Sequence, residues 1–199
     1  PSMILDSDTE KLQKKAGQIA GKALHHAAKM IKPGVKLLDV VEAAEEKIKA
    51  LGGGIAFPAQ TSRNDIAAHY CPKYKDETVY EEGDCVKLDV GTEVEGYIGD
   101  TAVTVDLGGW KELQQASKDA LKAAIKQVGP GITTSSVGKR IDEAIRSHGF
   151  QPIRNLSGHG LGQYDVHTKP SIPNFDTGDN IKLQEGQPIA IEPFATNGT

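Results

Sequence analysis

Three acidic residues adjoin stretches that alternate between apolar and polar positions, as strands do. Asp89 lies in the alternating run 85–90, and Asp100 opens the alternating run 100–105. A short hairpin would bring these two carboxylates near each other, and Glu192 follows a third strand candidate. Carboxylates that converge in one cleft repel one another unless they are protonated or bound to cations. The pattern therefore favours a site for two bridged divalent metal ions, an arrangement found in hydrolytic enzymes.

Three histidines could complete such a site. His159 lies between Gly158 and Gly160, which would let the backbone approach closely, so its imidazole is a candidate ligand. His69 and His167 could orient a substrate carbonyl or donate a hydrogen bond to developing charge. Taken singly, each candidate has a structural alternative, because aspartates often form turns and histidines often pack or face solvent. Only the symmetry of the whole set favours a functional interpretation.

The elements that position these residues can be predicted from periodicity and turn signals. Helical spacing of apolar residues predicts four helices, at about 8–31, 39–51, 110–128 and 135–148. Asp8 and Asp39 are expected N-caps, the latter in a capping box with Glu42. Residues 91–99 are expected to form a turn, and the Pro-, Asn-, Asp- and Gly-rich segment 165–179 a loop. The strand candidates are 85–90, 100–105 and 189–191.

The chain also repeats itself. Residues 24–52 match residues 121–149 at an offset of 97, with a helix, a Pro-Gly turn, a second helix and a glycine stop in each copy. Residues 82–89 match residues 185–192 at an offset of 103. The period is much longer than that of a solenoid repeat. It implies one α+β domain made of two similar halves.

The two halves span about 8–108 and 109–199, and a pseudo-two-fold axis is expected to relate them. The cleft between such halves is a natural ligand site. Asp89 and Glu192 are equivalent in the repeat, so the axis would bring them opposite each other. Asp100 lies on the partner strand of Asp89, whereas no equivalent partner strand follows Glu192. The fold as written is therefore expected to be incomplete.

Composition argues against several classes of function. The net charge is −4 over 199 residues and no cluster of basic residues occurs, so no nucleic-acid partner is expected. The longest apolar runs fall short of the about 20 residues that a membrane helix needs. No secretory signal is visible, and two cysteines, Cys71 and Cys85, are too few for a disulfide framework. A cytoplasmic location is therefore expected.

The motifs around these residues resemble those of the methionine aminopeptidases. Four segments resemble metal-ligand motifs of the family: Leu-Asp-Val-Gly at 88–91, Gly-Asp-Thr-Ala at 99–102, Leu-Ser-Gly-His-Gly at 156–160 and Ile-Glu-Pro-Phe-Ala at 191–195. Three more look like the type II branch in its compact archaeal form: 56–58, 64–70 and 167–174. The resemblance covers essentially the whole chain and implies the pita-bread fold, which has two symmetric halves.

The resemblance also implies a cofactor and a reaction. Two divalent ions (Co, Mn, Fe or Zn) would be bound, one by Asp89, both by Asp100, and the other by His159 and Glu192. The enzyme would remove the N-terminal methionine from nascent polypeptides by hydrolysis, with the metals activating water and polarising the carbonyl.

Further roles follow from the same resemblance. His69 and His167 would position the substrate or stabilise the transition state, and Glu192 would move a proton. Phe57 and Val166 match positions that line the methionine pocket. The free amino group of the substrate would lie near the metals, which restricts the reaction to chain ends.

One departure from the family bears on activity. The family has a fifth ligand, a bridging Glu on a late strand, and type II members carry a helical insertion with a pocket histidine; neither is in these 199 residues. A truncated sequence, a separately encoded second piece and a natural half-site protein are three explanations. We expect this chain alone to be poorly active, or to need a complementing C-terminal chain.

Two alternative functions share the same fold. A non-catalytic binding protein like the proliferation-associated relatives would have lost metal ligands, whereas the four ligand positions and both cleft histidines are present here. A prolidase-like hydrolase would typically carry an extra N-terminal domain.

Overall fold

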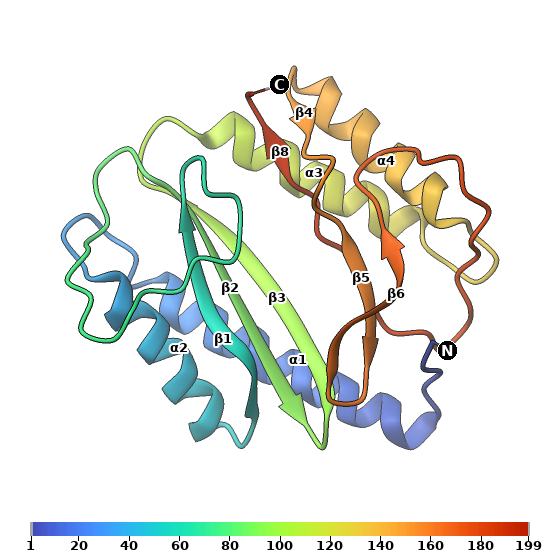
Figure 1. Ribbon diagram of the computed structural model, residues 1–199, viewed down its shortest axis with the longest axis horizontal. Helices are drawn as coiled ribbons and strands as arrows, with labels where there is room; N and C mark the ends of the chain where they lie inside the picture. The colour runs from blue at the N-terminus through green and yellow to red at the C-terminus, as the bar shows by residue number, and fades with distance from the viewer. Residues whose placement is uncertain (1, 199) are drawn as a thin grey trace. The chain divides into compact units, whose positions relative to one another are not determined.

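The computed structural model describes residues 2–198, which divide into two compact units (Figure 1). The N-terminal unit is Ser7–Trp110, and the C-terminal unit comprises residues 2–6 and 111–198. Within residues 2–198, no helix combines the length and apolar character needed to cross a membrane. The interpretation of the two units as halves of one catalytic domain stays a prediction.

The N-terminal unit packs two helices on one antiparallel sheet of strand order β1-β2-β3 (Figure 1). Its elements are α1 (Ser7–Ala28), α2 (Leu37–Ala50), β1 (Gly54–Arg63), β2 (Cys85–Val94) and β3 (Tyr97–Asp106). In β2, Val86, Leu88 and Val90 are fully buried in the core that the helices complete. Because side chains alternate along a strand, Lys87 and Asp89 point to the opposite face.

The C-terminal unit has two helices, a three-stranded sheet of order β6-β5-β7 and a two-stranded sheet of β4 and β8. Its elements are α3 (Lys111–Gln127), α4 (Thr134–Ser147), β4 (Gln151–Pro152), β5 (Gly158–Gly162), β6 (Asp165–Ile172), β7 (Ile189–Ala190) and β8 (Ala195–Thr196). Helices α3 and α4 pack on each other, and Val137, Ile141 and Ile145 of α4 lie in a second core. Each unit therefore has its own hydrophobic core.

The internal repeat is present in the backbone hydrogen bonds. The N–H of Gly34 donates to the carbonyl of Tyr80, and the N–H of Gly131 donates to the carbonyl of Leu183, both at 2.8 Å. The two donors, Gly34 and Gly131, are 97 residues apart, and the two acceptors, Tyr80 and Leu183, are 103 residues apart. These are the two offsets found in the sequence. Both glycines also have a positive φ, 90° and 84°, which residues other than glycine rarely adopt.

Strand pairing follows the same offsets. The pair Gly54–Glu93 of the N-terminal unit is equivalent to the pair Gln151–Thr196 of the C-terminal unit. In the same way, the pair Ser62–Lys87 is equivalent to the pair His159–Ala190. The long strand β1 thus corresponds to the two short strands β4 and β5, and the long strand β2 corresponds to the two short strands β7 and β8. Asp89 lies inside the continuous β2, whereas Glu192 lies between β7 and β8.

Both predicted acidic N-caps are wrong. Helix α1 begins at Ser7, so Asp8 lies in its first turn. Helix α2 begins at Leu37 after Lys36, with Asp39 in the first turn rather than in a capping box. A bridge between Lys36 and Val79 holds the chain just before the helix, so a tertiary contact sets its start. The acidic side chains still suit the positive end of the helix dipole.

The strand candidates 85–90, 100–105 and 189–191 overlap β2, β3 and β7, but the other strand predictions need correction. The turn expected at 91–99 is only Glu95 and Gly96, both with positive φ (52° and 86°), as in the tight turns of two-residue hairpins. Strands β1, β4, β5 and β8 are not predicted by the sequence, and β6 lies in the expected loop 165–179. In β1 the buried positions include the polar residues Thr61 and Ser62, which hides the alternation that marks a strand. In β6, Pro170 interrupts the segment, and a proline weakens the strand signal.

Candidate functional site

Asp89 and Asp100 lie on one face of the β2–β3 ribbon. Asp89 is opposite Ala102, and Asp100 is opposite Gly91, so the two aspartates are diagonal neighbours across the ladder. Diagonal positions lie about 7–8 Å apart between Cα atoms, within reach of a shared ligand. The expectation of strand-end positions is wrong, because both residues lie well inside longer strands. The face they share is the one opposite the helices.

Phe57 lies over this face. Its partner across β1 and β2 is Gly91, and a Cβ at Gly91 would overlap the Phe57 ring. Since Gly91 and Asp89 are two residues apart on one strand, that ring lies on the side of the sheet that carries the carboxylates. Phe57 is therefore placed where an apolar substrate side chain could meet it.

Two residues that the motifs did not single out share this face. Gln60 is directly opposite Asp89, and its Oε1 is buried with no hydrogen-bond partner among residues 2–198. The Lys87 ammonium donates to the carbonyl of Asn64 at 2.8 Å, and burial lowers the pKa of Lys87. Lys87 shares this face because it lies two residues before Asp89 on β2, which the alternation of the sequence already indicates. Gln60 is brought opposite Asp89 only by the pairing of β1 with β2.

His69 follows β1 in a segment that is tied back to that strand. The N–H of Thr61 donates to the carbonyl of Tyr70 at 2.9 Å, and the N–H of Tyr70 donates to Ser62 Oγ at 3.1 Å. His69 itself has a φ of 71°, which lies in a backbone region that residues other than glycine adopt sparingly. Such backbone strain clusters at functional sites, so it is consistent with the role expected for this histidine.

In the C-terminal unit, His159 and Glu192 meet directly. His159 Nε2 lies 3.0 Å from Glu192 Oε2. His159 Nδ1 lies 2.9 Å from the carbonyl oxygen of Gly160, which can only accept, so Nδ1 carries the proton. The lone pair of Nε2 then faces a carboxylate oxygen, and the two electron-rich atoms repel each other. A second proton on the imidazole or a cation bound between the two atoms would stabilise this contact. A backbone carbonyl that orients the imidazole in this way is the usual support of a metal-binding histidine.

The glycines on either side of His159 are required by close backbone contacts. A Cβ at Gly158 would collide with the carbonyl oxygen of Ala190, and a Cβ at Gly160 with that of Lys169. The expectation that these glycines permit close approach is therefore confirmed. They let β5 lie tightly between β7 and β6, which fixes the position of His159.

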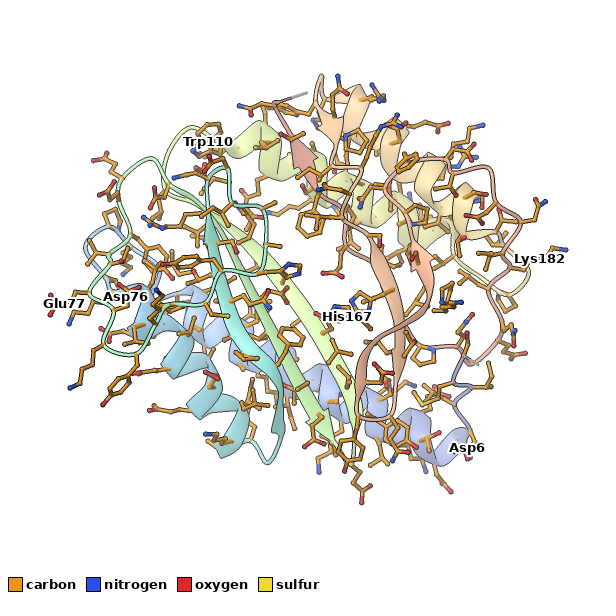
Figure 2. All side chains as sticks on the ribbon, in the orientation of Figure 1. Asp6, Asp76, Glu77, Trp110, His167 and Lys182 are labelled. Carbon is orange, nitrogen blue, oxygen red and sulfur yellow. The ribbon has the colours of Figure 1, made fainter. Side chains whose placement is uncertain are left out.

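His167 lies on β6 and is labelled in Figure 2. Its ring is 4.4 Å from that of His159, at an interplanar angle of 64°. The neighbouring Val166 is half-buried. The pairing of β5 with β6 shifts register between His159 and Gly162, so the simple alternation of faces does not hold at Val166 and His167.

The donor sets of the two units fit divalent transition metals. The N-terminal unit offers two carboxylates on one face, and the C-terminal unit offers an imidazole nitrogen and a carboxylate oxygen 3.0 Å apart. Mixed oxygen and nitrogen ligands suit Mn, Fe, Co and Zn. The expectation that Glu192 faces Asp89 concerns both units together and stays a prediction.

Comparisons with known proteins place the chain in a family. Residues 11–198 match the model described as metallopeptidase family M24. The methionine aminopeptidase of Archaeoglobus fulgidus is 50% identical over 98% of this chain and 67% of its own length. That of Methanocaldococcus jannaschii is 50% identical over 92% of this chain and 63% of its own. The chain thus spans about two-thirds of the length of these archaeal relatives.

A solved structure supports the same assignment. The crystal structure of the methionine aminopeptidase of Thermotoga maritima matches with a TM-score of 0.93 at 35% identity, covering 100% of this chain and 84% of that one. This match confirms the pita-bread α+β fold expected from the sequence.

Proposed function

The chain belongs to metallopeptidase family M24, with archaeal methionine aminopeptidases among its relatives, and on this premise we propose that it hydrolyses the first peptide bond of polypeptides that begin with methionine. Nascent chains in the cytoplasm are the substrates of this proposal. The alternative of a non-catalytic binding protein is not favoured, because the relatives at half identity are named as aminopeptidases.

Four residues would hold the metal ions. Asp89 would bind one ion, Asp100 both, and His159 with Glu192 the other. When bound, such a pair of ions lowers the pKa of a water molecule and polarises a carbonyl oxygen. The proton on His159 Nδ1 supports this assignment, because it leaves Nε2 available as a ligand.

The remaining site residues act on the substrate. His69 and His167 orient the carbonyl of the first residue and donate hydrogen bonds as its oxygen gains charge. Phe57 and Val166 line the pocket for the methionine side chain. Glu192 accepts a proton at its carboxylate and passes it to the leaving amine. The position of Phe57 over Gly91 supports the pocket assignment, because its ring adjoins the aspartate face.

One observation carries the proposal: equivalent positions of the repeat hold Asp89 and Glu192, the second 3.0 Å from the imidazole of His159. Acidic residues at equivalent positions of two repeats are not required by either hydrophobic core. A shared ligand explains why both units retain one.

The test measures metal binding first and hydrolysis second. Isothermal titration of the 199-residue chain with Mn²⁺ or Co²⁺ should show binding that His159→Ala weakens strongly. Methionine release from a Met-Ala-Ser peptide is then followed for the chain alone, and after mixing with the part of the Archaeoglobus relative that this chain does not cover. We expect weak release alone and more on mixing. Metal binding without release in either condition would overturn the proposed activity, and no binding would favour a binding module.

A further inference from the structure

Asn174 is a buried amide next to both candidate ligands of the C-terminal unit. It follows β6 and is only 1% exposed. Burying a primary amide is unfavourable unless its polar atoms find partners. The role of Asn174 can therefore be read from the groups that it contacts.

This amide makes three hydrogen bonds to backbone groups. Its Nδ2 donates to the carbonyl of Leu156 at 2.9 Å and to the carbonyl of Glu192 at 3.2 Å. Its Oδ1 accepts from the N–H of Phe194 at 3.1 Å. Two donors and one acceptor on so short a side chain are a combination that only asparagine offers.

The Glu192 segment needs such a partner because it lies outside the strand ladders. In the other copy of the repeat, Asp89 lies in β2, which is paired with β1 on one side and β3 on the other. Glu192 lies in residues 191–194, between the short strands β7 and β8. Buried backbone groups require hydrogen-bond partners. Asn174 supplies two of them, one to the carbonyl of Glu192 and one to the N–H of Phe194, two residues further on.

The same side chain reaches the segment that leads to His159. Leu156 precedes His159 by three residues, so Asn174 ties this segment to the one that carries Glu192. Asn174 is itself anchored, because its neighbour Phe175 lies against α4 at Gly138, where a Cβ would collide with the Phe175 carbonyl. The 3.0 Å separation of His159 Nε2 and Glu192 Oε2 depends on both segments.

We infer that Asn174 is a positioning residue for the metal ligands: it sets the distance and direction of Glu192 relative to His159 by holding their two backbone segments together. The metal-related part of this inference rests on the proposed function. The contact itself can be tested without metal.

The first experiment uses metal-free protein. Asn174→Ala removes the amide, and Asn174→Asp keeps its shape but turns an oxygen toward two carbonyls. Thr134→Val is the matched control, because Thr134 is fully buried in the same unit and donates from Oγ1 to Asp179 at 2.9 Å. We expect faster exchange of the Phe194 amide proton and shifted NMR signals of the His159 ring in both Asn174 variants only. If Asn174→Asp does not fold, Asn174→Ala carries the test. Unchanged exchange and unchanged ring signals would overturn the inference.

The second experiment measures metal affinity by titration with Mn²⁺, and the visible spectrum of bound Co²⁺. Groups that orient metal ligands change affinity by about 10–100-fold when removed. We expect an affinity loss of about 10-fold or more and an altered Co²⁺ spectrum for Asn174→Ala, with Thr134→Val close to the unchanged protein. Equal affinities and spectra for all three would overturn the inference while leaving the proposed function intact. If the unchanged protein binds neither ion, the proposed function fails, and the metal-free measurements decide the role of Asn174.

Discussion

At the scale of single residues, His159 is the most constrained member of the candidate site. The Gly160 carbonyl sets its tautomer, Glu192 lies against its other nitrogen, and His167 lies against its ring. Its backbone is confined as well, because Gly158 and Gly160 have no room for a side chain. A functional group held from so many sides can bind a metal without first losing conformational freedom.

Replacing Gly160 tests this confinement. In Gly160→Ala, the new Cβ meets the Lys169 carbonyl, so β5 and β6 must separate. We expect a loss of about 1–3 kcal/mol in the free energy of unfolding, as for other overpacked sites. Urea denaturation measures it. The matched control is Gly17→Ala in α1, where a Cβ meets nothing within 4 Å and should stabilise the helix by about 0.5–1 kcal/mol. Equal effects of the two substitutions would contradict the close contact at Gly160.

At the scale of elements, local periodicity predicts the helices and the strands β2, β3 and β7, but it misses the other strands. All four helices occur within a few residues of their predicted bounds, because each has an apolar face that one segment of sequence displays. Strand β1 was missed, although it positions Gln60 and Phe57 beside Asp89 and Gly91. Its partner β2 is far along the chain, and pairing at that separation leaves little trace in a local pattern.

The start of β2 depends on Asp84, a buried carboxylate at the foot of the hairpin. It accepts hydrogen bonds from the N–H of Glu81 at 2.9 Å, from Asn64 Nδ2 at 3.0 Å and from Arg63 at 3.4 Å. Burial by itself would raise the pKa of Asp84, but these donors and the charge of Arg63 hold it below its usual value.

Asp84 should therefore make stability depend on pH. Its folded pKa is below its unfolded value of about 4, so its contribution is present above pH 4 and is lost as the pH falls through the folded pKa. Asp84→Asn should lower the free energy of unfolding by about 1–3 kcal/mol at pH 7. Denaturation curves of both proteins between pH 7 and the acid range should converge as the pH falls. A constant difference across that range would show that the charge of Asp84 is not what matters.

At the scale of the whole molecule, the centre that we propose would take ligands from both compact units. Metal binding should then stabilise the folded chain against unfolding, by about 2.7 kcal/mol when the free metal is at 100 times its dissociation constant. Thermal unfolding with Mn²⁺, and again after a chelator, measures this shift.

Two substitutions test whether both units contribute. Asp89→Asn lies in the N-terminal unit and Glu192→Gln in the C-terminal unit. Each should abolish most of the metal-induced stabilisation, measured as the difference in unfolding temperature with and without metal. If only one of them reduces it, the metal is bound within a single unit, and the shared centre is wrong.

The sequence by itself determined the helices, the repeat with its two offsets, the candidate ligands and the family, because these depend on residue types at fixed spacings along the chain. The tertiary structure decided which face of β2 carries Asp89, which nitrogen of His159 lies against Glu192, and that Asn174 ties the segments of Leu156 and Glu192 together. Those features arise from contacts between residues far apart in the sequence. Hydrogen bonds and close packing at such separations are decided by how strands pair, and no local pattern of residues encodes that pairing.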